Sequence, residues 1–380
     1  MSKIIAFYFL YDNRSVRDKL RRKELIGYLV LENGQVFEGE RIGYNKDVIC
    51  EIVFNTSMTG YLEIFTDPSY AGQGIVMTYP LIGNYGLTLE DKESKKPWIE
   101  AVFVHELAEV ESNFRSILHV EKFLKYNKIP GLQGVNTRKL TKVLRENGTM
   151  KGMLTNDISD IKSIIKKIKE HNETNLVEKV TSNKSEIIGN GDINIGLLDF
   201  GSKQNIIKSL VERNCTVTVF PQDTDADLII SKKFDGIVLS NGPGNPEDCK
   251  VAIKNIKKLY DTEIPILAIC LGHQLMGLAN GFKTYKLKYG HRGPNHPVKD
   301  IKKDRVYITA QNHGYAIDAD SVDKNIAEIS HTNLNDNTVE GLKYKNKDIY
   351  TVQFHPEACP GPEDTRYIFD DFLEIVKNKK

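Results

Sequence analysis

The stretch Ile264–Gly281, IPILAICLGHQLMGLANG, decides the fold of the second half of the chain. An apolar run of strand character leads directly into Cys270, and apolar residues at helical spacing follow Leu271-Gly272. Similar short apolar runs come before it, each followed by a helical stretch or a glycine-rich turn: INIGLLDFG, TVTVFP and DGIVLSNGPG. Strands that alternate with helices predict an α/β domain with a doubly wound, mostly parallel sheet.

The first half shows mixed patterns that predict an α+β domain. Asn33-Gly34 lies between Tyr28–Leu31 and Val36–Gly39, and this pair predicts a β-hairpin with a tight primed turn. Further strands are expected at Val48–Asn55, Gly74–Tyr79 and Ala101–Leu107, and a helix at Thr137–Asn147 that ends at Gly148. We divide the 380 residues into an N-terminal extension (1–23), an α+β domain (24–171), a polar linker (172–192) and the α/β domain (193–380).

Composition narrows the class of protein. A formal net charge of +1 gives no reason to expect a nucleic acid or an acidic membrane surface as partner. The five cysteines are scattered without a CxxC pair, which argues against a disulfide framework and a zinc site. Ile4–Leu10 is apolar, but basic residues follow it rather than precede it, and it is far shorter than the ~20 residues that span a bilayer. We expect a cytoplasmic protein, with a targeting role of residues 1–23 as the open alternative.

Cys270 is a candidate nucleophile. A cysteine on a sharp turn from strand to helix is exposed at the sheet edge, and the next backbone N–H is free to face a developing oxyanion. The helix N-terminus also favours the thiolate. A buried structural cysteine is the alternative at this position.

His355 and Glu357 are the candidate partners of this nucleophile. A cysteine nucleophile needs a base, and the base needs an acceptor that orients it. In Tyr350–Pro360, YTVQFHPEACP, a strand ends at His355, and Glu357 is close enough to accept from one imidazole nitrogen while the other faces the thiol. A lone histidine is more often a hydrogen-bonded structural residue. The pairing with a strand-end cysteine favours a catalytic role for His355. Cys359 lies nearby in the sequence but is interpreted as incidental to the site.

Two further strand ends carry polar or glycine-rich turns. In Asp235–Pro246, Gly242 and Gly244 flank Pro243 and can offer backbone N–H groups to an anion or a carbonyl oxygen. In Tyr307–Ala316, Asn312 and the Gly314-Tyr315 backbone can bind polar groups of a substrate. An ordinary Gly/Pro turn is the alternative for the first of these segments.

Together, CLGHQ, SNGPGNP and QFHPEA resemble the motifs of class I, triad-type glutamine amidotransferases, in the same order, over Ile193–Lys380. FNTSMTGYLEIFTDPSYAGQGIVMTYPLIGNYG (Phe54–Gly86) and NTRKLTKVLRENGTMKGML (Asn136–Leu154) are similar to the small subunits of carbamoyl-phosphate synthetases. Two positions depart from that pattern: Asn136 stands where aspartate is expected, and Cys359 where serine is expected.

This resemblance implies a function and a set of site residues. Cys270 corresponds to the nucleophile, which forms a γ-glutamyl thioester from glutamine and releases ammonia, with His355 and Glu357 as the rest of the triad. The backbone N–H groups of Gly242 and Leu271 correspond to the oxyanion hole. The positions that hold L-glutamine correspond to Ser57, Gly242, Gly244, Leu271, Gln274, Asn312, Gly314 and Tyr315. Ser57 lies in the first half, so the two domains are expected to meet beside the active site.

The resemblance also implies a partner. A large synthetase subunit would form a heterodimer with this chain and would make carbamoyl phosphate from bicarbonate and ATP with Mg²⁺. No metal or organic cofactor is expected in this chain, and the lack of a GxxxxGK[ST] motif agrees with that division. Whether the product serves arginine or pyrimidine biosynthesis is left open.

Two other functions stay open at this point. A free-standing γ-glutamyl hydrolase would use the same triad without a large subunit. A non-catalytic scaffold subunit would keep the fold without turnover, but its expected signature is the loss of the cysteine, histidine or glutamate, and all three are present.

Overall fold

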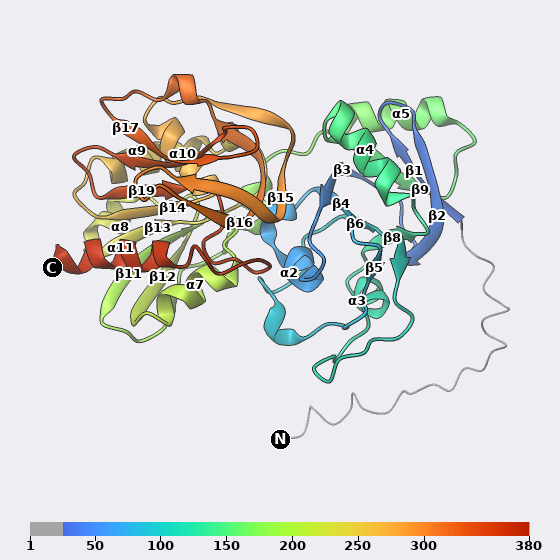
Figure 1. Cartoon of the computed structure of the whole chain (residues 1–380), viewed down its shortest axis with the longest axis horizontal. Helices are drawn as coiled ribbons and strands as arrows, with labels where there is room; N and C mark the ends of the chain where they lie inside the picture. The colour runs from blue at the N-terminus through green and yellow to red at the C-terminus, as the bar shows by residue number, and fades with distance from the viewer. Residues whose placement is uncertain (1–25, 380) are drawn as a thin grey trace.

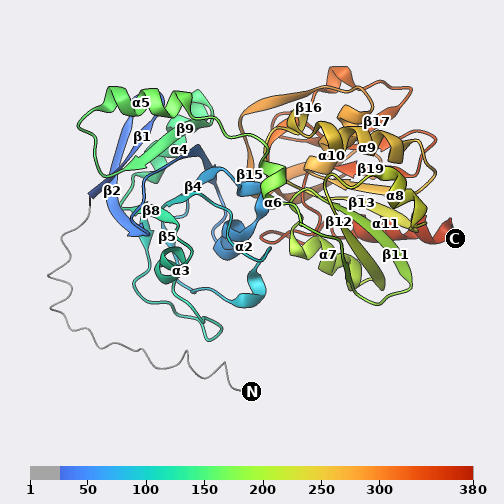
Figure 2. The same cartoon turned by 180° about the vertical axis from the view of Figure 1, so that it is seen from behind.

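The computed structural model describes residues 26–379, so the expected extension of residues 1–23 lies outside the described residues. Two bodies lie side by side, one built around a closed β-barrel and the other around an open sheet (Figures 1 and 2). The content is mixed α/β, as predicted from the alternating and mixed patterns of the two halves.

Seven strands form the barrel of the first body. In barrel order these are β1 (Ile26–Leu31), β2 (Val36–Gly43), β8 (Pro130–Gln133), β6 (Ala101–Phe103), β4 (Gln73–Met77), β3 (Val48–Asn55) and β9 (Met150–Thr155), and β9 pairs with β1 to close the ring. Successive residues of a strand face opposite sides. Ile52 therefore packs in a cluster with helix α4 (Thr137–Asn147), whereas Val53 packs with α2 (Tyr61–Thr66) and α3 (Val120–Tyr126).

The remaining elements of this body are short. A two-stranded sheet pairs β5 (Leu81–Ile82) with β7 (Glu106–Leu107), 3-10 turns occupy η2 (Pro68–Tyr70) and η3 (Leu89–Asp91), and helix α5 (Ile161–Glu170) packs on β1 and β9. Asn136 caps α4, because its side chain accepts from the N–H of Lys139 at 2.9 Å. Asparagine thus serves this cap in the place of the expected aspartate.

Two local predictions in this body are wrong. The Asn33-Gly34 hairpin does not use a two-residue primed turn, because only Gly34 of the pair has a positive φ (86°). The N–H of Gly34 donates to the Leu31 carbonyl and the N–H of Leu31 to the Gln35 carbonyl, the pattern of a three-residue loop with a glycine bulge. The expected strand Ala101–Leu107 is two strands, β6 and β7, in different sheets.

The second body contains a ten-stranded sheet. Its order is β10 (Glu186–Ile188), β12 (Cys215–Pro221), β11 (Ile193–Asp199), β13 (Gly236–Leu239), β14 (Ile266–Ile269), β19 (Ile349–Val352), β18 (Val339–Tyr344), β17 (Ala327–Asn333), β15 (Thr284–Asp300) and β16 (Arg305–Ile317). The neighbours from β12 to β19 run parallel, and all other pairs are antiparallel. The prediction of a mostly parallel sheet therefore holds only for this central part.

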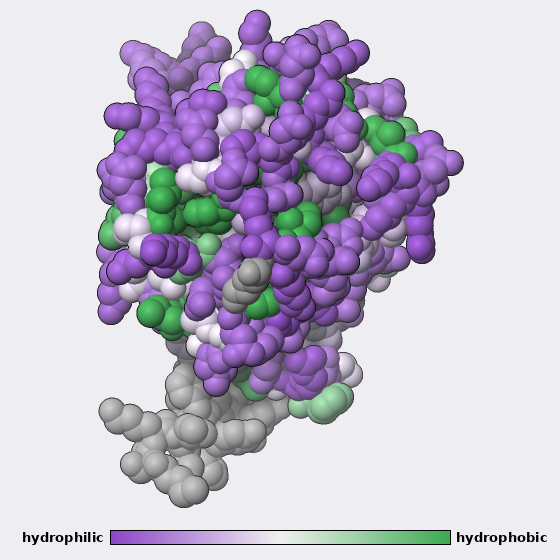
Figure 3. Space-filling model, turned by 90° about the vertical axis from the view of Figure 1, so that its left-hand side faces the viewer, coloured by the Kyte–Doolittle hydropathy of each residue, from purple (hydrophilic) through white to green (hydrophobic). Residues whose placement is uncertain are grey.

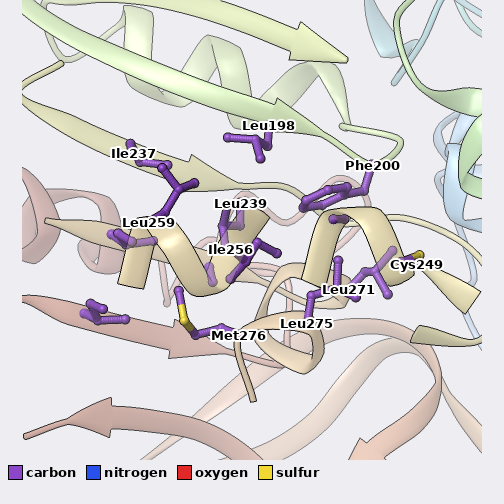
Figure 4. Close-up of a cluster of buried hydrophobic side chains, with 14 of the residues drawn as sticks. Leu198, Phe200, Ile237, Leu239, Cys249, Ile256, Leu259, Leu271, Leu275 and Met276 are labelled. Atoms are coloured by element: carbon purple, nitrogen blue, oxygen red, sulfur yellow. The ribbon is translucent and has the colours of Figure 1, made fainter. Parts of the chain in front are cut away.

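The parallel centre is covered on both faces by helices. On one face lie α8 (Ala226–Ser231), α9 (Lys250–Tyr260) and α10 (Leu271–Ala279), and on the other α7 (Gln204–Val211) and α11 (Tyr367–Asn378). Figure 4 shows the first layer, where Leu239 of β13 meets Leu271 and Leu275 of α10. This packing fixes the start of α10 against the end of β13.

The segment 172–192, predicted to be a linker, contains regular structure. Helix α6 (Leu176–Val180) lies in it, and β10 pairs with β12 as the edge strand of the sheet. The sheet of the second body therefore begins before Ile193. Two more 3-10 turns, η4 (Pro246–Asp248) and η5 (Ala319–Ser321), complete the described elements.

The surface is polar over the end of the sheet body that Figure 3 presents, with hydrophobic residues in small separate groups. Within residues 26–379, no helix combines the length and the hydrophobicity that crossing a membrane requires.

Candidate active site

Cys270 lies on a strained turn between β14 and α10. Its backbone has φ 54° and ψ −103°, a conformation that non-glycine residues rarely adopt. The turn is possible because Gly272 follows it: a Cβ on Gly272 would stand 2.5 Å from the Leu239 carbonyl oxygen. Strain of this kind collects at functional sites and presents a nucleophile at the edge of a sheet. The local geometry is thus that of a nucleophile turn, although Cys270 itself is buried, and its Sγ contacts the Asn312 carbonyl oxygen at 3.7 Å.

His355 and Glu357 lie just after β19, the strand next to β14 in the sheet. Both side chains are buried, and His355 Nδ1 is 2.6 Å from Glu357 Oε1. The other ring nitrogen, Nε2, is buried and has no hydrogen-bond partner in the described part of the chain. Burial opposes a charge on the imidazole, but Glu357 and then a Cys270 thiolate outweigh it and raise the pKa of His355 to about 10. The three predicted triad residues are therefore neighbours.

Lys203 is a fourth member of this cluster, which the sequence reasoning missed. Its ammonium is buried, lies 3.1 Å from Glu357 Oε1 and also donates to the Ala358 carbonyl. Burial raises the pKa of Glu357, but Lys203 and then His355 reverse this and lower it to about 2. Lys203 follows β11, so the strand-end rule that pointed to Cys270 and His355 could also have found it.

A cavity of about 430 Å³ opens beside Cys270 between the two bodies. Six of the eight positions predicted to hold glutamine line it together with Cys270: Gly242, Gly244, Gln274, Asn312, Gly314 and Tyr315. Gln274 fixes one wall, because its side-chain amide donates to the Tyr315 carbonyl at 2.7 Å and to Gln353 Oε1 at 2.9 Å. The cavity therefore presents backbone and amide groups to a polar ligand next to the thiol.

The other two predicted positions do not line this cavity. Ser57 borders a separate pocket of about 20 Å³, which also touches Asn312 and His355. Its hydroxyl is buried and makes no hydrogen bond with any residue the structure describes. Leu271 packs its side chain into the hydrophobic layer of α10, so only its backbone can face the site. A Cβ on Gly242 would stand 2.8 Å from the Leu271 side chain, which shows how closely the two proposed oxyanion-hole turns approach.

The first body supplies side chains that fix this site. Asp67 accepts from the Asn312 amide at 2.9 Å, and Ser69 accepts from the Asn241 amide at 2.9 Å. The expectation that the two halves meet beside the active site agrees with these contacts. Arg292, which the sequence reasoning did not single out, also lines the cavity, and its buried Nε has no hydrogen-bond partner among residues 26–379.

Histidines near the site are engaged in internal contacts. His273 is buried with Nδ1 2.7 Å from the Thr351 hydroxyl, and burial lowers its pKa to about 3. His291, His313 and Glu340 bring potential metal-ligand atoms within 4.8 Å of one another. These imidazoles are already hydrogen-bonded, however: His291 Nε2 lies 2.8 Å from Asp336 and His313 Nδ1 lies 2.7 Å from the Tyr315 carbonyl oxygen. Structural hydrogen bonding accounts for this group.

Comparison with known proteins identifies the family. Residues 29–154 match the family model described as carbamoyl-phosphate synthase small chain, CPSase domain, and residues 196–375 match glutamine amidotransferase class-I. The carbamoyl phosphate synthase small chain of Clostridium perfringens is 52% identical over 349 residues, which cover 92% of this chain and 99% of that protein. The chain belongs to the carbamoyl phosphate synthase small chain family.

Other members of the family show similar agreement. The carbamoyl phosphate synthase small chain of Listeria monocytogenes is 47% identical over 353 residues, covering 93% of this chain and 97% of that protein. The carbamoyl phosphate synthase pyrimidine-specific small chain of Bacillus subtilis is 46% identical over 353 residues, covering 92% and 95%. The resemblance inferred from the motifs is thereby confirmed. The class-I amidotransferase match includes Cys270, His355, Glu357 and Lys203.

Proposed function

We propose that this chain is the glutamine-hydrolysing subunit of a carbamoyl-phosphate synthetase, in which Cys270, His355 and Glu357 act as the catalytic triad. One observation carries the proposal. A cysteine on a strained strand-to-helix turn neighbours a buried His355–Glu357 pair, at the wall of a cavity whose lining includes amide, backbone and charged groups. Glutamine, with an amide side chain and a charged α-carbon end, is a ligand of suitable polarity for that cavity.

The first half of the reaction makes a thioester. The Cys270 thiolate attacks the side-chain amide carbon of glutamine, and the backbone N–H groups of Gly242 and Leu271 stabilise the oxyanion. His355 is protonated at neutral pH because Glu357 and the thiolate raise its pKa to about 10. It gives this proton to the amide nitrogen, the C–N bond breaks, and ammonia leaves.

The second half returns the enzyme to its starting state. The neutral imidazole of His355 takes a proton from a water molecule, which attacks the thioester carbon. The C–S bond breaks, glutamate leaves, and the thiolate and imidazolium are restored. Glu357 keeps the imidazole oriented throughout, and the buried Lys203 ammonium holds Glu357 ionised.

The partner in this proposal is a large synthetase subunit that receives the ammonia and joins it to bicarbonate with ATP and Mg²⁺. The second body would be the amidotransferase domain, and the barrel body would be a small-subunit domain that completes the glutamine site with Ser57. The chain would use no metal or organic cofactor of its own. The names of the relatives support such a partner, since small chain implies a complex.

A glutamine hydrolysis assay on the purified chain, with and without a carbamoyl-phosphate synthetase large subunit, tests the proposal. Weak basal hydrolysis that rises with the large subunit and disappears in Cys270→Ser is expected. Ammonia-dependent synthesis by the complex that contains Cys270→Ser should remain. Hydrolysis that does not respond to the large subunit would support a free-standing hydrolase, and loss of both activities in Cys270→Ser would make the cysteine structural.

A further inference from the structure

Glu93, a residue of the barrel body, is buried and contacts Gln204 and Asn205 of the sheet body. It follows η3 and is anchored on its own side, because its N–H donates to the Thr66 hydroxyl at 2.9 Å. Thr66 ends α2, the helix that begins shortly after Ser57. Glu93 is therefore held in a fixed position relative to the part of the barrel body that borders the active site.

On the other side, Glu93 caps a helix of the sheet body. Helix α7 has no capping hydrogen bond from its own N-cap side chain. The N–H of Gln204 donates to the Glu93 carbonyl oxygen at 2.7 Å, and the N–H of Asn205 donates to Glu93 Oε2 at 3.2 Å. The Asn205 amide donates to Glu93 Oε1 as well. A carboxylate in this place accepts hydrogen bonds from N–H groups that have no partner within the helix. Its negative charge also interacts favourably with the positive end of the helix dipole.

The residue before this helix is Lys203, which connects the cap to the triad. Its N–H donates to the Asn241 side chain at 3.0 Å, and its ammonium pairs with Glu357 Oε1 at 3.1 Å. The charge of Glu93 acts on the same ammonium, second only to Glu357 among the carboxylates around it. Glu93 thus fixes the backbone next to Lys203, and its negative charge acts on the Lys203 ammonium.

We propose that Glu93 is a positioning residue for glutamine hydrolysis: its ionised carboxylate holds Lys203 against Glu357 and so makes the triad depend on the docking of the barrel body. This inference rests on the proposed triad. Glu93 lines neither the cavity beside Cys270 nor the small pocket beside His355, so it acts through Lys203 rather than on the substrate. Its contribution should appear in kcat, while the KM for glutamine should stay unchanged.

The ionisation of Glu93 also gives the proposal a pH signature. Burial raises the pKa of this carboxyl to about 7, against the opposing effect of Lys203 and the Asn205 hydrogen bonds. The other titratable groups that act on it or respond to it are Glu357, Glu63 and Cys359. Glu93 therefore changes charge within the pH range in which the enzyme can be assayed.

The test compares the full chain with Glu93→Gln, which keeps the size and the hydrogen-bonding oxygen but removes the charge. At pH 8.5, kcat for glutamine hydrolysis should fall about tenfold, the effect of weakening one charged hydrogen bond. At pH 6, where Glu93 is mostly protonated in the wild type, the kcat values of the two enzymes should become similar. Glu90→Gln removes the same charge from an exposed residue of the same segment and should match the wild type at both pH values.

Asn205→Ala provides a second route if Glu93→Gln does not fold. It removes the amide that binds Glu93 Oε1 on a half-buried helix position, and it should lower kcat about threefold with the same convergence at pH 6. Lys208→Ala on the same helix is its control. A fall in kcat that is equal at both pH values, a change in KM alone, or no change would overturn the inference. Cys270→Ala separates the two proposals, because activity in that variant would refute the triad itself.

Discussion

The replacement Lys203→Met tests whether a buried ammonium behind the triad is needed for catalysis. Methionine has a similar length and removes the charge and the donors. The ammonium lies 3.1 Å from Glu357 Oε1, with 3% and 0% of the two side chains exposed, so solvent does not screen the pair. The variant leaves Glu357 with His355 as its remaining charged partner.

The magnitude follows from the Glu357 pKa. A shift from 4.5 to about 2 corresponds to roughly 3 kcal/mol of net stabilisation of the carboxylate, and Lys203 is the larger of its two charged causes. We assign about 2 kcal/mol to Lys203, within the range of a charged hydrogen bond. If the whole amount is lost in the transition state, kcat falls about 30-fold. The free energy of unfolding at pH 7 should fall by about 2 kcal/mol.

The pH dependence has a definite sign. Because the folded pKa of Glu357 lies below its unfolded value, its contribution to stability is present above pH 4.5 and is lost as the pH falls towards 2. The difference in unfolding free energy between wild type and Lys203→Met should therefore be largest at pH 7 and smaller at pH 3. Urea denaturation at the two pH values measures it, and steady-state hydrolysis at pH 7 measures kcat.

Lys208→Met on α7 is the matched control, since its side chain is 62% exposed and its pair with Glu212 spans 3.9 Å. It should leave kcat and stability unchanged. If Lys203→Met loses less than threefold in kcat, Lys203 does not orient the triad through Glu357. If it loses stability equally at pH 7 and pH 3, packing rather than the charge of Glu357 explains the loss.

Three further substitutions test other parts of the site. His355→Asn should slow single-turnover glutamine hydrolysis by roughly 10⁴-fold, and a loss below tenfold would remove His355 from the mechanism. Asp67→Ala removes the acceptor that orients the Asn312 amide and should raise the KM for glutamine about tenfold with little change in kcat; an unchanged KM would show that Asn312 does not bind substrate. Gly272→Ala places a Cβ 2.5 Å from the Leu239 carbonyl oxygen and should lower the free energy of unfolding by about 2 kcal/mol in urea denaturation, whereas wild-type stability would show that this turn can relax.

The triad could be predicted because its signals are local. Cys270 and His355 each follow a short apolar run, and in a parallel sheet the strand ends meet at one edge. A two-residue spacing is enough to bring Glu357 to His355, since the turn itself sets the 2.6 Å contact. Sequence reasoning succeeds in such places because each residue's position depends on its own strand and turn.

The barrel and the supporting charges could not be predicted in this way. Closing the barrel requires β1 to pair with β9, which is distant in sequence, and apolar patterning does not specify such a partner. The long antiparallel ladder of β15 and β16 is mostly polar where it faces the barrel body. It therefore lacks the short apolar runs from which the parallel strands could be predicted. Lys203 could be placed at a strand end, but its partner Glu357 depends on how two separate turns pack.

The sheet body and the barrel body contribute different parts of the site. The three triad residues themselves all lie on the sheet body. The polar groups around the triad are held by residues of the barrel. Asp67 accepts a hydrogen bond from the Asn312 amide, Ser69 accepts one from the Asn241 amide, and Glu93 caps the start of α7. Without the barrel these buried groups would lose their partners, at a cost of about 1–3 kcal/mol for each. Docking of the barrel therefore stabilises the arrangement in which the amide wall and the charge behind Glu357 are ready for substrate, and a weakened docking surface would reduce hydrolysis without touching any triad residue.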